Sequence, residues 1–489
     1  MRVDQEIKRG TFFVFIAKYS NILIGLVINS ILARFLSPNE YGIVGVVTVF
    51  ITFFSILGDI GVGTAIVQNR DLTPKDISDI FKITILLSIC LGLSFYLLSY
   101  GIAWFYESDV YILIGQLLAI SVFFSSLSGV PRSLLMREKS FKLLGGIEII
   151  ASITTGILVV FLAVKGYSYY SIIWRSILSN LMICLMCFYF SKLRLAEGFG
   201  FGGFRKIARY SGFQFAFNFI NYFSRNLDNI LIGKFMGNQN LGIYSQSYQL
   251  MMYPVANLTH VITPVLHPVL ARYVDQPKTI FEEYLKVVNI LAMLGIPISI
   301  FVFFSSEEIV YLVLGAKWME VAPVLQIFGA SIWLQMVNSS GGAIFQSMGR
   351  TDMLFKMGIL STFTTISATL LGILHFESLT MTALCISIAI AANFVIVYYV
   401  LISKILGGSF SRFLKVIAKH IKLAVVLILL LYLTQVFGNF KQDNASLIYL
   451  FLIKSAIAGI TFFAFHFEMV MGLTKKVLAN VSVRMKSKP

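Results

Sequence analysis

Two stretches of this chain resemble each other at a fixed spacing of 200 residues without a gap. Residues 9–43 read RGTFFVFIAKYSNILIGLVINSILARFLSPNEYGI, and residues 209–243 read RYSGFQFAFNFINYFSRNLDNILIGKFMGNQNLGI. The identical pairs are Arg9/Arg209, Phe13/Phe213, Phe15/Phe215, Asn21/Asn221, Asn29/Asn229, Phe35/Phe235, Gly42/Gly242 and Ile43/Ile243. A repeat this long in a hydrophobic chain indicates a duplicated membrane unit, which is typical of transporters, whose binding sites lie at the repeat interface.

The composition indicates a membrane protein. Apolar residues make up 57% of the chain and charged residues 13%, against about 25% charged in soluble domains. Apolar runs of about 20 residues, each long enough to cross roughly 30 Å of hydrocarbon, recur along the chain, whereas the alternating segments of a β-barrel are absent. We therefore predict an all-α polytopic membrane protein with fourteen transmembrane helices. The predicted spans are 11–33, 41–66, 80–101, 110–130, 144–164, 169–191, 210–235, 243–272, 286–305, 321–345, 357–375, 380–403, 420–437 and 447–467.

The positions of lysine and arginine predict the orientation. With the N-terminus inside, the inner segments and their flanks hold 30 of the 39 basic residues, and the outer loops hold five. This asymmetry is a strong positive-inside signal, so both termini are expected in the cytoplasm of a bacterial cell, with the chain in the cytoplasmic (inner) membrane. The N-terminal segment precedes a full-length span and is interpreted as an uncleaved first helix.

The net charge of +16 does not indicate nucleic-acid binding. The basic residues are spread over every predicted cytoplasmic loop, where the topology rule and anionic headgroups account for them. We therefore expect membrane lipids, and no nucleic acid, among the partners.

The repeat also predicts the domain organisation. Six helices separate the two copies, and an even number keeps both copies in the same orientation, which is the arrangement of parallel repeats. We predict an N-terminal six-helix lobe over residues 1–191, a glycine-rich cytoplasmic linker over 192–209 and a C-terminal six-helix lobe over 210–403. Residues 404–489 then contain two extra transmembrane helices and a cytoplasmic tail.

Several kinds of chemistry have no support in the sequence. No phosphate-binding Gly-x-x-x-x-Gly-Lys-Ser/Thr motif occurs, so ATP hydrolysis is not expected. His260 and His267 share a helix face, but two ligands do not make a metal site. Cys184 and Cys187 lie in an apolar helix, where cysteine is usually a small buried side chain. We predict no cofactor, no metal and no catalytic residue, hence a protein that is not an enzyme.

The informative polar residues are the charges inside predicted spans. An unpaired charge near the bilayer centre costs at least about 2.5–3.5 kcal/mol, so such residues usually face a cavity or a partner. Lys18 and Asp59 lie at similar depths on neighbouring helices and could pair, while Arg225 and Asp228 lie on one helix face. Two further charges, Arg175 and Lys454, lie nearer the outer surface, where their side chains could snorkel.

These charges are not repeated between the two copies. Their equivalents in the other copy are Asn218 for Lys18, Gly25 for Arg225 and Ile28 for Asp228. Asymmetric charges on a symmetric scaffold suggest recognition of an asymmetric substrate, and the alternative is a salt bridge that stabilises one lobe. We predict Lys18 and Arg225 as substrate-binding cavity charges and Asp59 and Asp228 as candidates for ion or proton coupling. The repeated asparagines 21/221 and 29/229 are expected to form interhelical hydrogen bonds.

Several motifs resemble those of the Wzx-type polysaccharide flippases. Residues 32–42 (LARFLSPNEYG) and 59–68 (DIGVGTAIVQ) are similar to the opening of that family. Residues 225–237 (RNLDNILIGKFMG), 241–245 (LGIYS) and 348–352 (MGRTD) are similar to its second half. The resemblance covers essentially the whole chain and is closest to the colanic-acid and teichuronic-acid exporter branch.

This resemblance implies the fold of the multidrug/oligosaccharidyl-lipid/polysaccharide exporter superfamily, in which two six-helix lobes form a V-shaped cavity. It implies a transporter that flips an undecaprenyl-pyrophosphate-linked oligosaccharide for lipopolysaccharide, O-antigen or capsule synthesis by alternating access. The lipid-linked oligosaccharide is then the substrate, and the polysaccharide polymerase or chain-length machinery is the expected protein partner. A cavity lysine or arginine would compensate the charge of the phosphates, which cannot enter hydrocarbon unaided.

Two alternatives remain open at this point. An ion-coupled drug or cation antiporter of the same superfamily would share the fold, although fourteen spans and the motifs above favour the flippase. A membrane glycosyltransferase or polymerase generally needs a substantial outer loop, and the longest one here, 306–320, has only some fifteen residues.

Overall fold

The protein is described by a computed structural model. The backbone is described for residues 2–59, 62–69, 71–196, 198, 200, 202–437 and 444–467. Within these ranges, the side chains of residues 2–16, 59, 64–65, 68, 202–221, 223–225, 260–265, 267–269 and 444–445 lie outside the description.

The described part of the chain is helical and contains no strand. The helices of the first half are α1 (Arg2–Phe35), α2 (Pro38–Asp59), α3 (Val62–Gln68), α4 (Pro74–Tyr106), α5 (Val110–Leu127), α6 (Gly129–Arg137), α7 (Phe141–Val164), α8 (Tyr170–Ser191) and the long α9 (Gly202–Leu270). The second half contains α10 (Pro277–Phe304), α11 (Ser306–Val313), α12 (Val321–Ser347), α13 (Thr351–Leu374), α14 (Leu379–Tyr399), α15 (Phe410–Ala418), α16 (Ile421–Phe437) and α17 (Asn444–Phe465). Three short elements join them, namely η1 (Ala271–Tyr273), η2 (Ala316–Trp318) and the π-helical η3 (Val400–Ile405).

The predicted fold class is confirmed. Eleven helical segments in the described residues are long and apolar enough to cross a membrane. The three remaining predicted spans, 11–33, 210–235 and 243–272, lie on α1 and on the two parts of α9. Each of the fourteen predicted spans therefore coincides with a helix.

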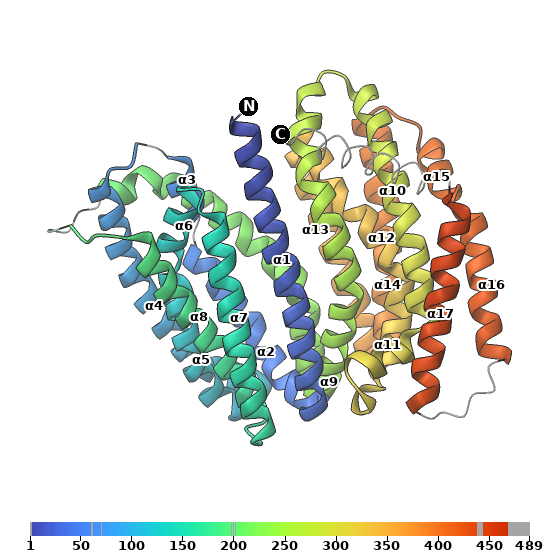
Figure 1. The fold of residues 1–489 in the computed structure, drawn as a ribbon, viewed down its shortest axis with the longest axis horizontal. Helices are drawn as coiled ribbons and strands as arrows, with labels where there is room; N and C mark the ends of the chain where they lie inside the picture. The colour runs from blue at the N-terminus through green and yellow to red at the C-terminus, as the bar shows by residue number, and fades with distance from the viewer. Residues whose placement is uncertain are drawn as a thin grey trace, which may run out of the picture. The chain divides into compact units, whose positions relative to one another are not determined.

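The chain divides into two compact units, Met1–Ser245 and Gln246–Pro489 (Figure 1). The division falls within α9, whereas the repeat predicts a boundary between lobes at 192–209. The two units are defined by packing, whereas the predicted lobes are defined by the sequence repeat, so the two divisions need not agree. The lobes remain a prediction.

In the first unit, one membrane helix is interrupted close to its end. The break between α5 and α6 falls at Ser128. Pro131 lies in the first turn of α6 and cannot donate to the carbonyl oxygen of Leu127, so the helical hydrogen-bond ladder stops there. The short helices α3 and α6 pack against each other.

The core of the second unit contains polar groups that are paired. The hydroxyl groups of Tyr284 and Tyr398 are 2.9 Å apart, and Ser340 Oγ lies 2.9 Å from the Tyr284 hydroxyl. Tyr398 also donates to the carbonyl oxygen of Val337 at 2.7 Å. Because buried hydroxyls need such partners, this network fixes the relative rotation of α10, α12 and α14.

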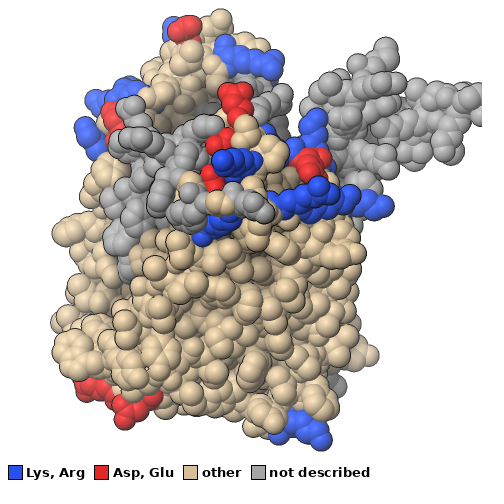
Figure 2. All heavy atoms as spheres, turned by 90° about the vertical axis from the view of Figure 1, so that its left-hand side faces the viewer, with Lys and Arg blue, Asp and Glu red and all other residues tan. Residues whose placement is uncertain are grey.

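On one face of the molecule, the charged residues gather at the two ends. Figure 2 shows a broad band without lysine, arginine, aspartate or glutamate over one face, with basic residues gathered at its upper end. The short helices α3 and α6 lie toward the same end in Figure 1. A charge-free band of this kind is expected where helices face hydrocarbon.

Candidate functional site

The two copies of the repeat are interrupted at equivalent positions. In the first copy, α1 ends at Phe35 and α2 begins at Pro38. In the second copy, α9 continues through the equivalent position but is kinked at Gly237, which has φ 84° and ψ 175°. A residue with a side chain is strained at that φ, so glycine is what allows the second copy to turn here.

Gly42 and Gly242 bring the two copies into backbone contact. A Cβ atom at Gly42 would lie 1.7 Å from the carbonyl oxygen of Asn238, and one at Gly242 would lie 1.9 Å from that of Pro38. Pro38 and Asn238 are themselves equivalent in the repeat, so the two contacts are reciprocal. Helix α2 and the second part of α9 therefore begin against each other with no side chain between them.

Polar contacts surround this junction. Ser37 and Glu40 form a capping box at the start of α2, with Ser37 N–H donating to Glu40 Oε2 at 2.7 Å and Glu40 N–H donating to Ser37 Oγ at 3.4 Å. Tyr111, from α5, donates its hydroxyl hydrogen to Asn238 Oδ1 at 2.6 Å. The junction is thereby connected to the rest of the first unit.

Asp228 is held by a tyrosine on the other side of the kink. The Tyr244 hydroxyl donates to Asp228 Oδ2 at 2.6 Å, and the backbone N–H of Asn229 donates to Oδ1 at 2.8 Å. In the first copy, Tyr41 donates to Asn29 Oδ1 at 3.0 Å. Both copies therefore use a tyrosine just after the break to bond a polar residue before it, but only the second copy places a carboxylate there.

The other predicted site residues are only partly described. Lys18 lies on α1 with an exposed side chain. The side chains of Asp59 and Arg225 lie outside the described residues. The suggested pairs Lys18–Asp59 and Arg225–Asp228 therefore remain predictions, and so do the roles of all four residues.

Of the repeated asparagines expected to bond between helices, Asn29 does so through Tyr41. Asn229 instead bonds the adjacent Asp228, with Nδ2 lying 3.3 Å from Oδ1. The Asn21 side-chain oxygen is buried and has no hydrogen-bond partner among the described residues, and Asn221 has no described side chain.

An ion pair near the junction joins Glu107, the residue after α4, to α9. Lys234 Nζ lies 2.7 Å from Glu107 Oε1 and 5.3 Å from the ring centroid of Phe105. This hydrogen bond and the lysine charge lower the pKa of Glu107 from its ordinary value. Glu107 is largely exposed, with 81% of its side chain accessible, so the pair is expected to contribute little to stability.

The second unit contains a buried ion pair that the sequence did not indicate. Lys454 on α17 pairs with Glu308 on α11, and their side chains are 3% and 4% exposed. Lys454 Nζ also donates to the carbonyl oxygen of Phe304 at 2.6 Å. The position of Lys454 near the end of a span had suggested that its side chain snorkels to the surface. It does not, because the side chain is buried in this pair. Arg175, the other residue expected to snorkel, is half-buried.

A polar cavity of about 90 Å³ adjoins this pair, with Glu307, Gln326 and Gln435 among its lining residues. Water can occupy a cavity of this size and polarity. The pair attaches α17 to α11, since removing either charge would leave the other buried without compensation.

The possible metal ligands and the cysteines are described only in part. Among the described residues, no group of three or more histidine, cysteine, aspartate or glutamate side chains could hold a metal ion. Cys184 and Cys187 are buried and free, as expected for small side chains in an apolar helix.

The described residues are helical, and eleven of their segments are long and apolar enough to cross a membrane, which defines a multi-pass membrane protein. The fold is that of the lipid II flippase MurJ in an inward closed conformation, with a TM-score of 0.72 over 94% of this chain and 100% of that chain at 16% identity. A multidrug resistance transporter of the MATE family, in an inward-facing conformation, matches with a TM-score of 0.61 over 78% of this chain and 94% of that chain at 15% identity.

The family follows from the sequence comparison. A family model described as "Polysaccharide biosynthesis protein" matches residues 31–323. Because this match covers more than half of the chain, the protein belongs to that family.

Curated relatives agree with this assignment. The teichuronic acid biosynthesis protein TuaB of Bacillus subtilis is 25% identical over 72% of this chain and 74% of its own length. The lipopolysaccharide biosynthesis protein WzxC of Escherichia coli is 23% identical over 85% of this chain and 84% of its own length. The resemblance to the Wzx-type family is thereby confirmed.

Proposed function

We propose that this protein flips a lipid-linked oligosaccharide, built on undecaprenyl pyrophosphate, across the cytoplasmic membrane for surface polysaccharide synthesis. The observation that carries this proposal is the match of residues 31–323 to the polysaccharide biosynthesis family. It is supported by relatives named for teichuronic acid and lipopolysaccharide biosynthesis and by a fold shared with a lipid II flippase.

The proposed substrate has a headgroup with at least two negative charges and a long apolar tail. The charged end cannot cross hydrocarbon unaided, so the protein must supply compensating charge along its path. Lys18 and Arg225 are the proposed phosphate contacts, and the side chain of Lys18 is exposed. Arginine and lysine suit this role because both form charge-assisted hydrogen bonds to phosphate oxygens.

Asp59 and Asp228 are the proposed sites for a coupling ion or proton. Asp228 accepts hydrogen bonds from Tyr244 and Asn229, and a proton on its carboxyl group would compete with the Tyr244 donor at Oδ2. Protonation of Asp228 would therefore loosen the link across the kink at Gly237. This gives the second copy of the repeat a means of responding to an ion gradient that the first copy lacks.

The proposed orientation places both termini in the cytoplasm, because the inner segments hold 30 of the 39 basic residues. The junction of Gly42 with Gly242 then lies on the outer side of the membrane. Its close backbone contact is suited to block passage on that side.

The direct test is flipping by purified protein in vesicles that contain a fluorescent undecaprenyl-pyrophosphate oligosaccharide. Reduction of the fluorophore by impermeant dithionite reports how much headgroup is exposed outside. We expect the protein to equilibrate the two leaflets, and empty vesicles or vesicles with a mutant carrying Gly42→Trp serve as controls. No acceleration of flipping in vesicles that contain folded protein would contradict the proposal.

The same vesicles distinguish the two alternatives. An ion-coupled antiporter would move a cationic dye against an imposed sodium or proton gradient without flipping the lipid. A glycosyltransferase or polymerase would produce longer glycans, which gel analysis of the extracted lipid would detect.

A further inference from the structure

A short helix that precedes α16 and α17 has a different character from the spans. Helix α15 (Phe410–Ala418) lies between η3 and α16, in the segment that the charge asymmetry places on the cytoplasmic side. Phe413 and Val416 are buried, whereas Leu414 and Lys415 are exposed. The helix therefore buries apolar side chains on one face and exposes basic and apolar side chains on the other. This pattern is typical of helices that lie at a membrane surface.

The core of the second unit fixes the position of this helix. Phe413 is fully buried, and its ring is stacked on that of Tyr398 with 4.9 Å between centroids. The chain approaches through Gly407, which has φ 60°, and Gly408, where a Cβ atom would lie 2.8 Å from the ring of Phe281. Only a residue without a side chain permits this approach of the connecting segment to α10.

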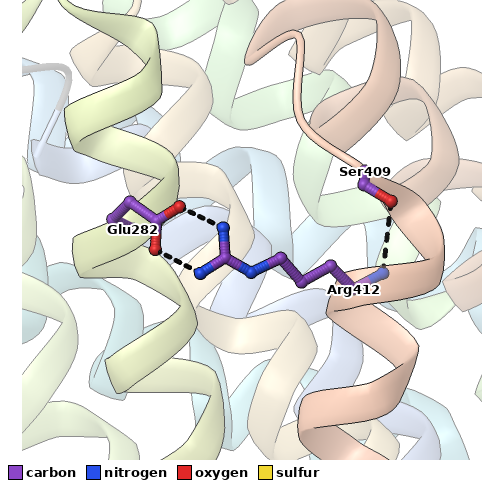
Figure 3. Close-up of polar contacts among 3 residues, drawn as sticks. All are labelled: Glu282, Ser409 and Arg412. Carbon is purple, nitrogen blue, oxygen red and sulfur yellow. Dashed lines mark hydrogen bonds and ion pairs between the residues drawn. The ribbon is translucent and has the colours of Figure 1, made fainter.

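A charged contact adds to this attachment. Arg412 forms a two-pronged interaction with Glu282 on α10, and the second of its bonds, from Nη2 to Oε2, is 2.8 Å long (Figure 3). The Arg412 backbone N–H also donates to Ser409 Oγ at 3.3 Å, which caps the helix. Arg412 is thereby neutralised and held, so it serves to position α15 rather than to attract a ligand.

Four neighbouring lysines are not neutralised in this way. Residues 404–422 include five basic residues and no acidic residue. Lys404, Lys415, Lys419 and Lys422 are exposed, and none of them forms an ion pair with a described residue. Leu414, 44% exposed, lies next to Lys415. Helix α15 and the residues on either side of it thus present positive charge, unpaired among the described residues, beside exposed apolar surface.

We propose that α15 and the start of α16 form a binding surface for anionic phospholipid headgroups of the cytoplasmic leaflet. Lys415, Lys419 and Lys422 contact the phosphates, and Leu414 enters the region where the acyl chains begin. Each lysine near an anionic surface is expected to strengthen binding about fivefold. The bound lipid would hold α16 and α17 at a fixed height relative to α10, to which Arg412 ties the same segment.

The test compares two sets of lysines in the full-length protein. One variant carries Lys415→Gln, Lys419→Gln and Lys422→Gln. The matched control carries Lys75→Gln, Lys278→Gln and Lys356→Gln, which are also exposed and lie on the predicted inner side. Purified proteins are titrated with phosphatidylglycerol or phosphatidylcholine of the same acyl chains, and bound lipid is counted by native mass spectrometry.

We expect the α15 variant to bind phosphatidylglycerol at least about tenfold more weakly than the natural protein, with no change for phosphatidylcholine. The control set should lose less than half of its phosphatidylglycerol affinity. A third variant with arginine at positions 415, 419 and 422 should retain binding, which shows that charge, and not an altered fold, is responsible. Equal losses in the α15 and control sets, or no loss in either, would overturn the proposal.

Discussion

Gly42 and Gly242 occupy equivalent positions in the internal repeat and lie against each other in the structure. A Cβ atom at Gly242 would be 3.1 Å from the backbone nitrogen of Gly42 and 1.9 Å from the carbonyl oxygen of Pro38. The sequence identity at these positions therefore has a physical cause, since each copy must present bare backbone to the other. It also makes the junction sensitive to the addition of one methyl group.

The first prediction concerns this junction. Gly42→Ala or Gly242→Ala should push the start of α2 away from the second part of α9, because the added methyl group overlaps the facing backbone. Overpacking of this kind typically lowers stability by about 1–3 kcal/mol. We expect a lower Tm and slower flipping in the vesicle assay.

Gly146→Ala on α7 is the matched control for the junction. A Cβ atom there meets nothing within 4 Å, and alanine is favoured over glycine inside a helix by about 1 kcal/mol. The junction would not be a closed contact in the protein if Gly42→Ala and Gly146→Ala gave the same Tm and rate.

The second prediction concerns the buried pair Lys454–Glu308. Lys454→Met leaves the Glu308 carboxylate buried without its partner, which typically costs about 3–5 kcal/mol. The double variant Lys454→Met/Glu308→Leu should recover most of the lost stability, because two apolar side chains fill the site without a charge. Thermal unfolding of Lys454→Met, of Glu308→Leu and of the double variant in detergent measures the coupling. If the single and double variants were equally unstable, the pair would not account for the attachment of α17.

The third prediction tests whether Lys18 binds substrate or only pairs with Asp59. Lys18→Ala should leave protein abundance near normal while lipid-linked oligosaccharide accumulates in the inner leaflet. The double variant Lys18→Met/Asp59→Leu should fold well but still fail to export. Export at the natural rate by the double variant would show that Lys18 and Asp59 only form an ion pair and do not bind substrate.

The same comparison applies to Arg225 and Asp228 in the second copy of the repeat. Tyr244→Phe is an additional probe there, because it removes the donor to Asp228 Oδ2 without changing the charge. Loss of a hydrogen bond to a charged group costs about 1.5–3 kcal/mol. We expect Tyr244→Phe to lower the Tm, whereas combining it with Asp228→Asn should add little further loss. Additive losses would indicate that the hydroxyl and the carboxylate act independently.

The fourth prediction concerns orientation. In a cysteine-free background, single cysteines at Asn39, Asp109 and Gln239 should react with an impermeant thiol reagent added to cells whose outer membrane, where present, is made permeable. Cysteines at Lys75 and Lys278 should react only after lysis. These five positions are exposed, whereas Ser78, in the same cytoplasmic segment as Lys75, is buried and accepts a hydrogen bond from the Ala196 backbone. Protection of the first set in intact cells would reverse the orientation.

The sequence by itself determined the fold class, the fourteen helices and the family. Each transmembrane span is a local property of about 20 consecutive residues, because hydrocarbon thickness sets the length and the cost of charge sets the composition. The repeat was also determined by the sequence alone, since a match at an offset of 200 residues can be detected without knowing how the helices pack.

The partners of individual polar side chains were decided only by the tertiary structure. Asp228 bonds Tyr244 across the kink at Gly237, and Lys454 is buried against Glu308, which lies 146 residues earlier. Both contacts depend on how each helix is rotated about its axis and on which neighbour it meets. The sequence of an apolar span does not predict this rotation, because the faces that contact lipid and the faces that contact other helices are equally apolar. The reciprocal contact at Gly42 and Gly242 shows the same limit, since the sequence contains both glycines but only packing brings them together.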